Sequence, residues 1–488
     1  MKNRAWIALA LIINLSAYQA GAEEALKSTL DDQQSVEVTV YNSNIGLVKD
    51  RRKIGMGKGE GELRFMDVAA FINPVTVHIK SLKDPNSFTV LEQNYEYDLM
   101  DANKLLDKYV GKKIKLLTVN QFQDKKEEVE AELLSNNNGQ IFKIGNEIHL
   151  GHPGYKILPE IPENLIAKPT LSWLYKNSSA SPQEIQVSYL TNNINWKADY
   201  IVVLNKDDTM ADVSGWVSLD NKSGATYNNA KLKLVAGEVN RVQGKDYRMM
   251  AKMARSDMAM EAMAPQFVES GFFEYHIYDL QRPTTIKNNQ TKQVNLLEAT
   301  GAKVKKEMIV YGQNYYYIGS YMGQDLKDPV NVYIKFKNEE ANNLGMPLPA
   351  GTMRMYKKDA QDSLQFIGED MIKHTPKDEE VKLKIGEAFD VVVERKQVDF
   401  QTEYVGGDYL YETEWEISLR NHKNEDAMVI LIEPMAYANW QIINSTHPHI
   451  KEDAFSARFE INIPKDKEEV LKYRIEVSSS KSRLTKRP

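Results

Sequence analysis

Six methionines in one short segment are the residues of this sequence best suited to binding a soft metal ion. They fall within fifteen residues, with Met-x-x-Met and Met-x-Met spacings: Met249, Met250, Met253, Met258, Met260 and Met263. Thioether sulfur suits Cu(I), so the cluster predicts a copper site as one alternative. The surrounding alanines and charges, which lack a strand period, instead favour a linker or a partner-binding segment, because methionine adapts to many surfaces. We favour the linker.

Two histidine pairs are weaker metal candidates. His149 and His152 lie three residues apart, and His447 and His449 flank a proline. Two imidazoles that face the same way can share a zinc ion. The HExxH pattern is absent, however, and no carboxylate is fixed beside either pair by its spacing. We therefore expect loops at both places, and we assign no cofactor.

Catalytic residues stay unassigned. The chain has no cysteine nucleophile and no G-x-S-x-G elbow, and a glycosidase pair cannot be chosen from 68 acidic residues. Aromatic side chains could stack on sugars, although on strands they more often belong to the core. The residues considered for this role are Trp196, Trp216, Tyr315, Tyr316, Tyr317, Trp415 and Trp440.

The first 22 residues have the pattern of a secretory signal peptide. Lys2 and Arg4 precede an apolar stretch that ends in the small residues Ala20-Gly21-Ala22. The apolar stretch is shorter than the roughly 20 residues that span a bilayer, and no later segment is apolar enough to do so. Removing the signal would change the formal net charge from −6 to −8. This acidic balance disfavours nucleic acid as a partner.

The elements that must position any site are mostly strands. Apolar residues alternate with polar ones in six segments: 36–40, 332–336, 381–385, 415–419, 459–463 and 473–477. Alternation of period two indicates antiparallel sheets with one face in a core. We expect a hairpin at Asn136-Asn137-Asn138-Gly139, a short helix over 101–109 and a single helical turn over 66–72. The predicted fold is mostly β, with multidomain antiparallel sandwiches and a small barrel-like or hairpin module.

The composition along the chain predicts a succession of modules. In order, these are a signal peptide (1–22), an N-terminal β module (35–97), a small barrel or hairpin module (98–165), a β region (184–241), a Met-rich flexible segment (242–270), a β sandwich region (271–400) and a C-terminal β sandwich (408–478). The last boundary is placed where Gly406-Gly407 interrupts the alternation.

Two blocks of sequence resemble a known family. The first contains Asn195-Trp196-Lys197-Ala198-Asp199-Tyr200, Gly215-Trp216-Val217, Asn221-Lys222-Ser223-Gly224 and Leu234-Val235-Ala236-Gly237. The second contains Leu344-Gly345-Met346-Pro347-Leu348-Pro349-Ala350-Gly351, Gly368-Glu369-Asp370, His374-Thr375-Pro376 and Gly386-Glu387-Ala388-Phe389-Asp390. Together they resemble the bacterial domain-of-unknown-function family numbered 4139, whose longer relatives are called mucoidy inhibitor A proteins. The resemblance covers about 187–477 and implies a mainly β build in the bacterial envelope, with no catalytic residues.

The sequence thus predicts an exported envelope protein, periplasmic or secreted, that acts as a non-enzymatic binding or scaffolding protein. Its expected partner is an envelope protein or a polysaccharide. Two alternatives stay open, a periplasmic hydrolase of envelope polysaccharide and a copper-binding protein. The oligomeric state is not predicted.

Overall fold

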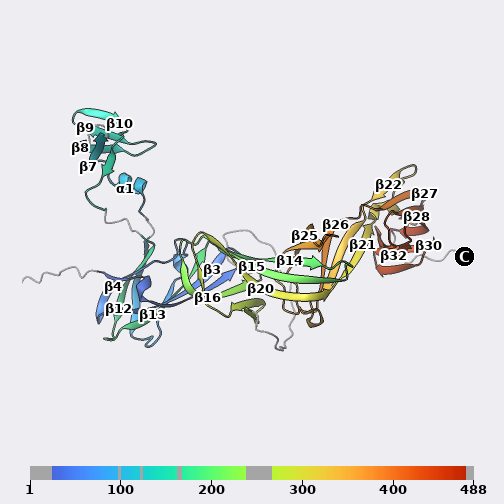
Figure 1. The fold of residues 1–488 in the computed structure, drawn as a ribbon, viewed down its shortest axis with the longest axis horizontal. Helices are drawn as coiled ribbons and strands as arrows, with labels where there is room; N and C mark the ends of the chain where they lie inside the picture. Colours follow the sequence, from blue (N-terminus) through green and yellow to red (C-terminus); the bar gives the residue numbers. More distant parts are fainter. Residues whose placement is uncertain (1–24, 97–99, 121–124, 162–167, 238–265, 480–488) are drawn as a thin grey trace, which may run out of the picture.

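The computed structural model describes residues 25–96, 100–120, 125–161, 168–237 and 266–479. These residues form 33 strands and one short α-helix, mostly in antiparallel pairs (Figure 1), which confirms the predicted mostly β class. The described part of the chain contains no helix long and apolar enough to cross a membrane. The predicted signal peptide and the six methionines lie outside the described residues.

Five sheets follow one another along an elongated body (Figure 1). The first sheet contains β1 (Leu26–Ser28), β4 (Gly59–Met66), β12 (Thr170–Asn177) and β6 (Phe88–Glu96). The second contains β17 (Phe267–Phe272), β18 (Tyr275–Leu280), β16 (Tyr227–Ala236), β2 (Gln33–Tyr41), β3 (Ile45–Ile54), β13 (Gln183–Asn192) and β5 (His78–Ser81), with β19 (Thr284–Ile286) beside β16. The second sheet therefore combines strands that are far apart in the sequence.

The other three sheets follow toward the C-terminal end of the body (Figure 1). The third contains β20 (Gln290–Lys303), β15 (Met210–Asn221), β14 (Ile194–Leu204), β24 (Gly351–Lys358) and β25 (Leu364–Ile372). The fourth contains β26 (Glu380–Glu387), β23 (Asn331–Lys337), β21 (Lys305–Tyr311), β29 (Ala427–Pro434), β32 (Ser456–Ile463) and β31 (His449–Asp453). The fifth contains β22 (Asp325–Asp328), β27 (Val391–Val405), β28 (Asp408–Asn421), β33 (Glu468–Ser478) and β30 (Asn439–Ser445). Short 3-10 turns lie between strands: η1 (Leu30–Asp32), η2 (Pro74–Thr76), η3 (Asn314–Tyr317) and η4 (Glu340–Asn342).

Long strands allow one sheet to pack against two others. Near the start of β14, the ring of Trp196 lies 6.2 Å from that of Tyr278 and its Nε1 donates to the Val235 carbonyl, both in the second sheet. Beyond the other end of β14, the Asp208 carboxylate accepts a hydrogen bond of 2.7 Å from Lys306 of the fourth sheet. One buried core consequently runs from the first sheet to Phe336 in the fourth.

A second core fills the space between the fourth and fifth sheets. Its fully buried members include Val429, Leu431, Phe459, Ile461, Trp415, Ile417, Leu471, Tyr473 and Ile475. These residues occupy alternate positions on their strands, as the period-two segments predict. All six predicted segments lie on strands, namely β2, β23, β26, β28, β32 and β33.

A small lobe projects from the N-terminal end of the body (Figure 1). It consists of α1 (Ala102–Lys108) and a five-stranded sheet in the order β10 (Glu147–Leu150), β9 (Ile141–Ile144), β8 (Lys125–Ser135), β7 (Lys113–Asn120) and β11 (Tyr155–Ile157). The lobe is an insertion between β6 and β12, which pair with each other in the first sheet.

Local signals predicted most of the lobe. The Asp101 carboxylate caps α1 by accepting from the amides of Asn103 and Lys104, which confirms the short helix. Asn138 and Gly139 have positive φ in the turn between β8 and β9, which confirms the hairpin. The sheet ends at β10 and β11, so the hairpin interpretation is right and the barrel interpretation is wrong. The predicted helical turn at 66–72 is also wrong, because Met66 ends β4.

Four buried asparagines mark the places where the chain passes from one sheet to the next. Each stands at the end of a strand, and its Nδ2 donates to three backbone carbonyls: Asn177 (Met56, Gly57, Ser179), Asn221 (Ala225, Ile286, Lys287), Asn338 (Met346, Thr375, Pro376) and Asn421 (Glu425, Ile463, Pro464). Each amide side chain thereby satisfies carbonyls that the corner would otherwise bury without a donor.

Replacing one of these side chains should destabilise its sandwich. We expect Asn421→Ala to lower the free energy of unfolding by about 2 kcal/mol or more, because buried carbonyls lose their donor. Urea unfolding followed by tryptophan fluorescence measures this change. Asn137→Ala, in the exposed turn of the lobe, is the control and should leave the midpoint unchanged. Equal midpoints for the two variants would contradict the role given to the asparagines.

Candidate functional site

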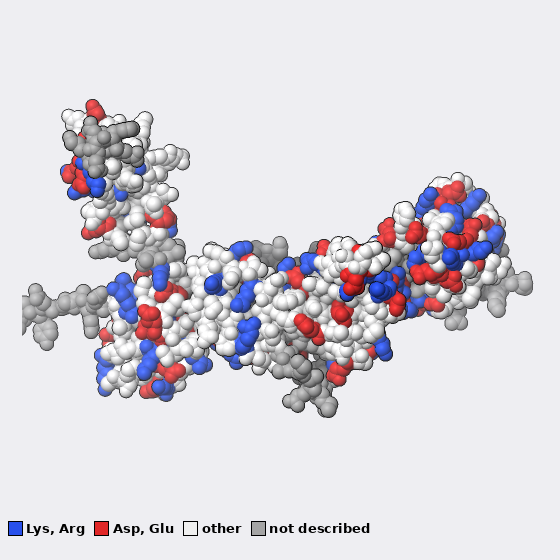
Figure 2. Space-filling view, in the orientation of Figure 1, with Lys and Arg blue, Asp and Glu red and all other residues white. Residues whose placement is uncertain are grey.

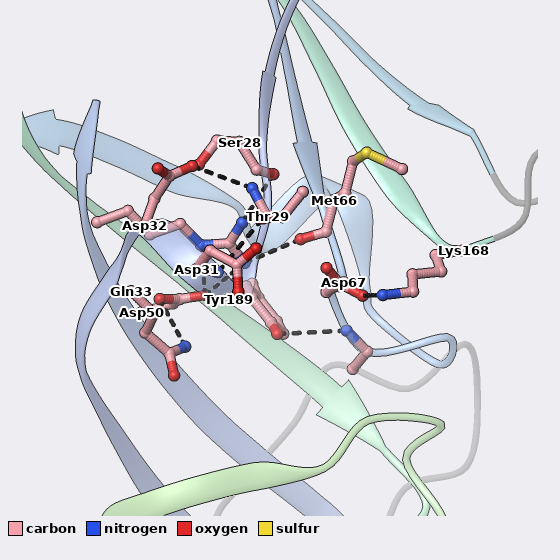
Figure 3. Close-up of polar contacts among 12 residues, drawn as sticks. Ser28, Thr29, Asp31, Asp32, Gln33, Asp50, Met66, Asp67, Lys168 and Tyr189 are labelled. Atoms are coloured by element: carbon pink, nitrogen blue, oxygen red, sulfur yellow. Dashed lines mark hydrogen bonds and ion pairs between the residues drawn. The ribbon is translucent and has the colours of Figure 1, made fainter. Parts of the chain in front are cut away.

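The first buried polar cluster surrounds Arg52, which has no solvent exposure. Its guanidinium donates to the Asp50 carboxylate at 2.8 Å and to the carbonyls of Ser28 and Met66 at 2.9 and 2.8 Å. Figure 3 shows these groups converging from separate strands. The guanidinium carbon also lies 3.6 Å from the centre of the Phe65 ring. Since Arg52 belongs to the second sheet and three of its partners to the first, the cluster joins the two sheets.

The second cluster surrounds Arg395 on β27. Its Nη1 and Nη2 donate to the two Glu433 oxygens at 3.2 and 3.0 Å, and its Nε donates to Asp328. The Tyr317 hydroxyl donates to the same Glu433 carboxylate and lies 2.8 Å from the Tyr473 hydroxyl. Glu433 belongs to the fourth sheet and Arg395 to the fifth, so this ion pair joins a second pair of sheets.

The Arg395 cluster is closed to solvent, and its own members shift the pKa values of Arg395 and Tyr317. Burial by itself would lower the pKa of the Arg395 guanidinium, but the nearby carboxylates of Glu433 and Asp328 hold this pKa well above its usual value. Burial, together with the charge of Glu433, raises the pKa of the Tyr317 hydroxyl. A Cβ on Gly312 would lie 2.2 Å from a Glu433 oxygen, so glycine is needed there for space. The cluster therefore holds sheets together and offers no group to a substrate.

The predicted metal ligands have ordinary partners. His149 Nε2 lies 3.4 Å from the Glu147 carboxylate, and His152 Nδ1 accepts from the Gly154 amide at 3.0 Å. In the other pair, the ring of His449 packs against that of Phe459. Among the described residues, no three His, Cys, Asp or Glu side chains are placed to hold a metal ion. The copper site remains a prediction, because its methionines lie outside the described chain.

The aromatic residues proposed for sugar stacking are mostly in the core. Trp196, Trp415, Trp440, Tyr316 and Tyr317 are buried. Trp216 is partly exposed, and Tyr315 is about half exposed. These residues do not form a common platform, so the exposed aromatic surface has to be sought elsewhere on the molecule.

Four aromatic residues at the end of the β27–β28 hairpin form a surface, two residues exposed and two partly buried, here called the aromatic strip. It consists of Phe400, Tyr404, Tyr409 and Tyr411, which the strand register places on one face. Ring centres are 4.9 Å apart for Tyr404 and Tyr409, 6.0 Å for Tyr409 and Tyr411, and 6.5 Å for Phe400 and Tyr411. Tyr404 is 65% exposed and Tyr409 is 49% exposed.

The strip continues the core face of the fifth sheet beyond the end of the sandwich. Along β28, Trp415 and Thr413 are fully buried, Tyr411 is partly exposed and Tyr409 is half exposed, although all four lie on one face. Partial burial, and the neighbouring Tyr437 and Tyr409, raise the pKa of the Tyr411 hydroxyl. Exposure rises along one face, so the covering sheet ends before the hairpin does.

The opposite face of the hairpin is held by one arginine. Arg474 of β33 donates to Glu412 and Glu414 at 2.8 and 2.7 Å and lies 3.0 Å from Asp399. These hydrogen bonds raise the pKa of the Arg474 guanidinium above its usual value. Figure 2 shows this end of the molecule crowded with charges of both signs. The charged network fixes β27 and β28 against β33, on the face of the hairpin opposite the aromatic strip.

The aromatic strip was not predicted from the sequence, although the two glycines of the hairpin loop are a signal for it. Gly406 and Gly407, taken as a boundary, have φ of 64° and 97° and form the two-residue loop of the hairpin. Positive φ at both positions is typical of the turn that joins two strands directly. A hairpin at this position places Tyr404 and Tyr409, which lie on either side of the turn, on one face of the sheet.

Comparison with known families matches residues 185–483 to a family described as "Domain of unknown function (DUF4139)". This match confirms the resemblance found in the sequence. No curated protein matches the chain. The matched region begins in β13 and includes the Arg395 cluster and the aromatic strip, whereas Arg52 and the lobe precede it.

Breaking the ion pair of the Arg395 cluster should be far more harmful than removing the whole pair. We expect Glu433→Ala to cost about 3–5 kcal/mol of unfolding free energy, because a buried charge loses its main partner. The triple variant Asp328→Asn/Arg395→Met/Glu433→Leu, which removes the pair together with the second carboxylate bound to Arg395, should recover most of that loss. Denaturant unfolding gives both values, with Glu416→Ala, which removes an exposed partner of Lys472, as the control. A loss for Glu433→Ala no larger than that of the control would contradict this prediction.

Proposed function

This chain belongs to the DUF4139 family, and we propose that it is an exported, non-enzymatic binding protein of the bacterial envelope that holds polysaccharide on the aromatic strip. The observation that carries the proposal is the exposed set of neighbouring rings on one sheet face. Residues 1–22 support export, because they have the charge and apolar pattern of a signal peptide. A periplasmic or secreted location follows from the same pattern.

The chemistry of the strip suits a sugar chain. Aromatic rings offer flat apolar faces, and the tyrosine hydroxyls add hydrogen-bonding groups at the ring edges. The exposed polar residue Thr402 lies between Phe400 and Tyr404 on the same face of β27. Since the chain carries a net negative charge, neutral polysaccharides or amino sugars fit better than acidic polysaccharides.

The body also suits a scaffold. Three of its five sheets each pack against two neighbours, so the successive sandwiches are not separated by linkers. The strip lies in the last of these sheets, at the end of the elongated body opposite the lobe (Figure 1). A ligand bound there lies at one end of the row of shared sheets.

The pKa shifts of the described carboxyl groups favour a binding role over hydrolysis. A glycosidase needs a carboxylic acid whose pKa is raised above its usual value. Carboxyl groups with shifted pKa here, such as those of Asp199 and Asp208, have the pKa lowered, since hydrogen bonds and nearby cations outweigh the burial that would raise it. Glu380 lines a depression of about 280 Å3 and pairs with Lys335 at 3.1 Å. The Glu380 carboxylate in this depression is therefore already paired with a cation.

Removing the two most exposed rings should weaken sugar binding without unfolding the protein. We expect Tyr404→Ala/Tyr409→Ala to lower the affinity about tenfold or more, since each stacked ring contributes about 1 kcal/mol. Co-sedimentation with peptidoglycan sacculi and affinity electrophoresis in soluble envelope polysaccharide provide the measurement.

The control for this prediction is Tyr155→Ala, which removes a tyrosine of the lobe that is more exposed than Tyr404 or Tyr409. It should bind like the unaltered chain. Near-ultraviolet circular dichroism checks that both variants keep their cores. The proposal is wrong if the folded double variant keeps full affinity, or if the unaltered chain binds neither material.

A further inference from the structure

We infer that the lobe pairs with the lobe of a second copy of this chain through the free edge of β10. This strand is the last in its sheet and pairs only with β9 within the described chain. An edge strand presents unpaired amides and carbonyls, which makes it a template for another strand. Edges are usually protected by charge, proline or a covering element, and among the described residues nothing of this kind protects Ile148 and Leu150, whose backbone groups face outward from β10.

The hydrogen-bonding pattern shows which residues face outward. The Gly151 amide donates to the Gln140 carbonyl, so this pair belongs to the hydrogen-bonded set of the β9–β10 ladder. Such pairs alternate with non-bonded ones in antiparallel strands. His149 is therefore bonded to Phe142 across the ladder, while the amides and carbonyls of Ile148 and Leu150 point away from β9.

The side chains at these two positions are apolar and uncovered. Ile148 is 67% exposed and Leu150 is 84% exposed, and both project from the sheet face opposite α1 and the core of the lobe. Their cross-strand partners on that face are Lys143 and Ile141. The edge thus combines free backbone groups with apolar surface, the two features that favour the addition of a strand.

The occupant is a second copy because the edge is complementary to itself. Antiparallel pairing about a two-fold axis at His149 places Ile148 of each copy opposite Leu150 of the other copy. The hydrogen-bonding positions of the two edges then coincide, and the four apolar side chains meet on one face. The two lobe sheets become one continuous sheet of ten strands.

The charges fit the same register. Glu147 lies opposite Gly151 of the second copy, so the two carboxylates do not face each other across the new ladder, and the two His149 side chains meet on the axis. Glu147 is also a diagonal neighbour of the second copy's His149, and within one chain the two side chains are already 3.4 Å apart. The alternation of carboxylates and imidazoles around the axis is favourable to pairing.

The opposite edge of the lobe sheet lacks this combination. β11 has three residues and is flanked by Pro153 and Pro159. Proline cannot donate to a ladder and is typical of protected edges. Of the two edges of the lobe sheet, β10 is therefore the one available for pairing.

A single introduced cysteine tests the register directly, because the chain contains no cysteine of its own. His149→Cys would place the two sulfur-bearing residues in a non-bonded pair with Cα atoms about 4.5 Å apart, within the range for a disulfide. We expect oxidation of the full chain to give a covalent dimer on a non-reducing gel. Glu147→Cys is the matched control, since its two copies would lie about 13 Å apart along the strands and should crosslink at least about tenfold less.

Sedimentation velocity on the cysteine-free chain gives an independent measurement. We expect a concentration-dependent dimer that becomes a monomer with Ile148→Pro, which removes an outward amide and leaves the pairing with β9 intact. The inference is overturned if the chain stays monomeric, if Ile148→Pro leaves a dimer unchanged, or if Glu147→Cys crosslinks as well as His149→Cys. A lobe that accepts only a partner's extended peptide would give no disulfide dimer, and that result would also overturn it.

Discussion

Long strands with one unbroken buried face are the constraint on which the rest of this structure depends. β14 and β15 have 11 and 12 residues, well above the usual strand length of about 5–6. In β14, every second side chain from Ile194 to Leu204 is buried. One half of that face packs against the second sheet, and the other half contributes to the core that reaches the fourth. A slip of one residue would expose the whole face to water, so the register of these strands fixes several sandwiches together.

Apolar faces alone allow neighbouring sheets to slide, and the buried polar groups remove that freedom. Arg52 and Arg395 each require partners from two sheets, and their guanidinium groups accept only a narrow geometry. The asparagines act at the corners, where Asn177, Asn221 and Asn421 each bind three carbonyls. A misplaced sheet would leave these donors and acceptors buried without partners, which is costly in a core. The polar groups therefore select one arrangement among those that the apolar faces permit.

Local patterns in the sequence predicted the strands, the lobe hairpin and α1, because alternation, an Asn-Gly turn and an N-cap are properties of neighbouring residues. The sequence did not predict that strands from distant segments share one sheet. This sharing depends on pairs such as β2 with β16, in which Glu37 lies beside Lys231, a residue nearly 200 positions further along the chain. Nor does any local rule show that Arg52 and Arg395 are buried, since arginine on a strand is usually exposed. Tyr409 and Trp415 share one face of one strand, and only the end of the covering sheet makes the first a surface residue and the second a core residue.

The positions of the two exposed features have a joint consequence. The lobe lies at the N-terminal end of the elongated body and the aromatic strip at the C-terminal end, with the shared sheets between them (Figure 1). Lobes that pair edge to edge would bring two bodies together at one end and leave both strips free at the other. When both sites of one dimer can reach the same repetitive polymer, the overall affinity is about 10²–10⁴ times higher than that of one site. A set of four rings, two of them exposed and two partly buried, is a modest site by itself. Binding of a long polysaccharide by the aromatic strip is therefore best explained by a dimer that carries two strips.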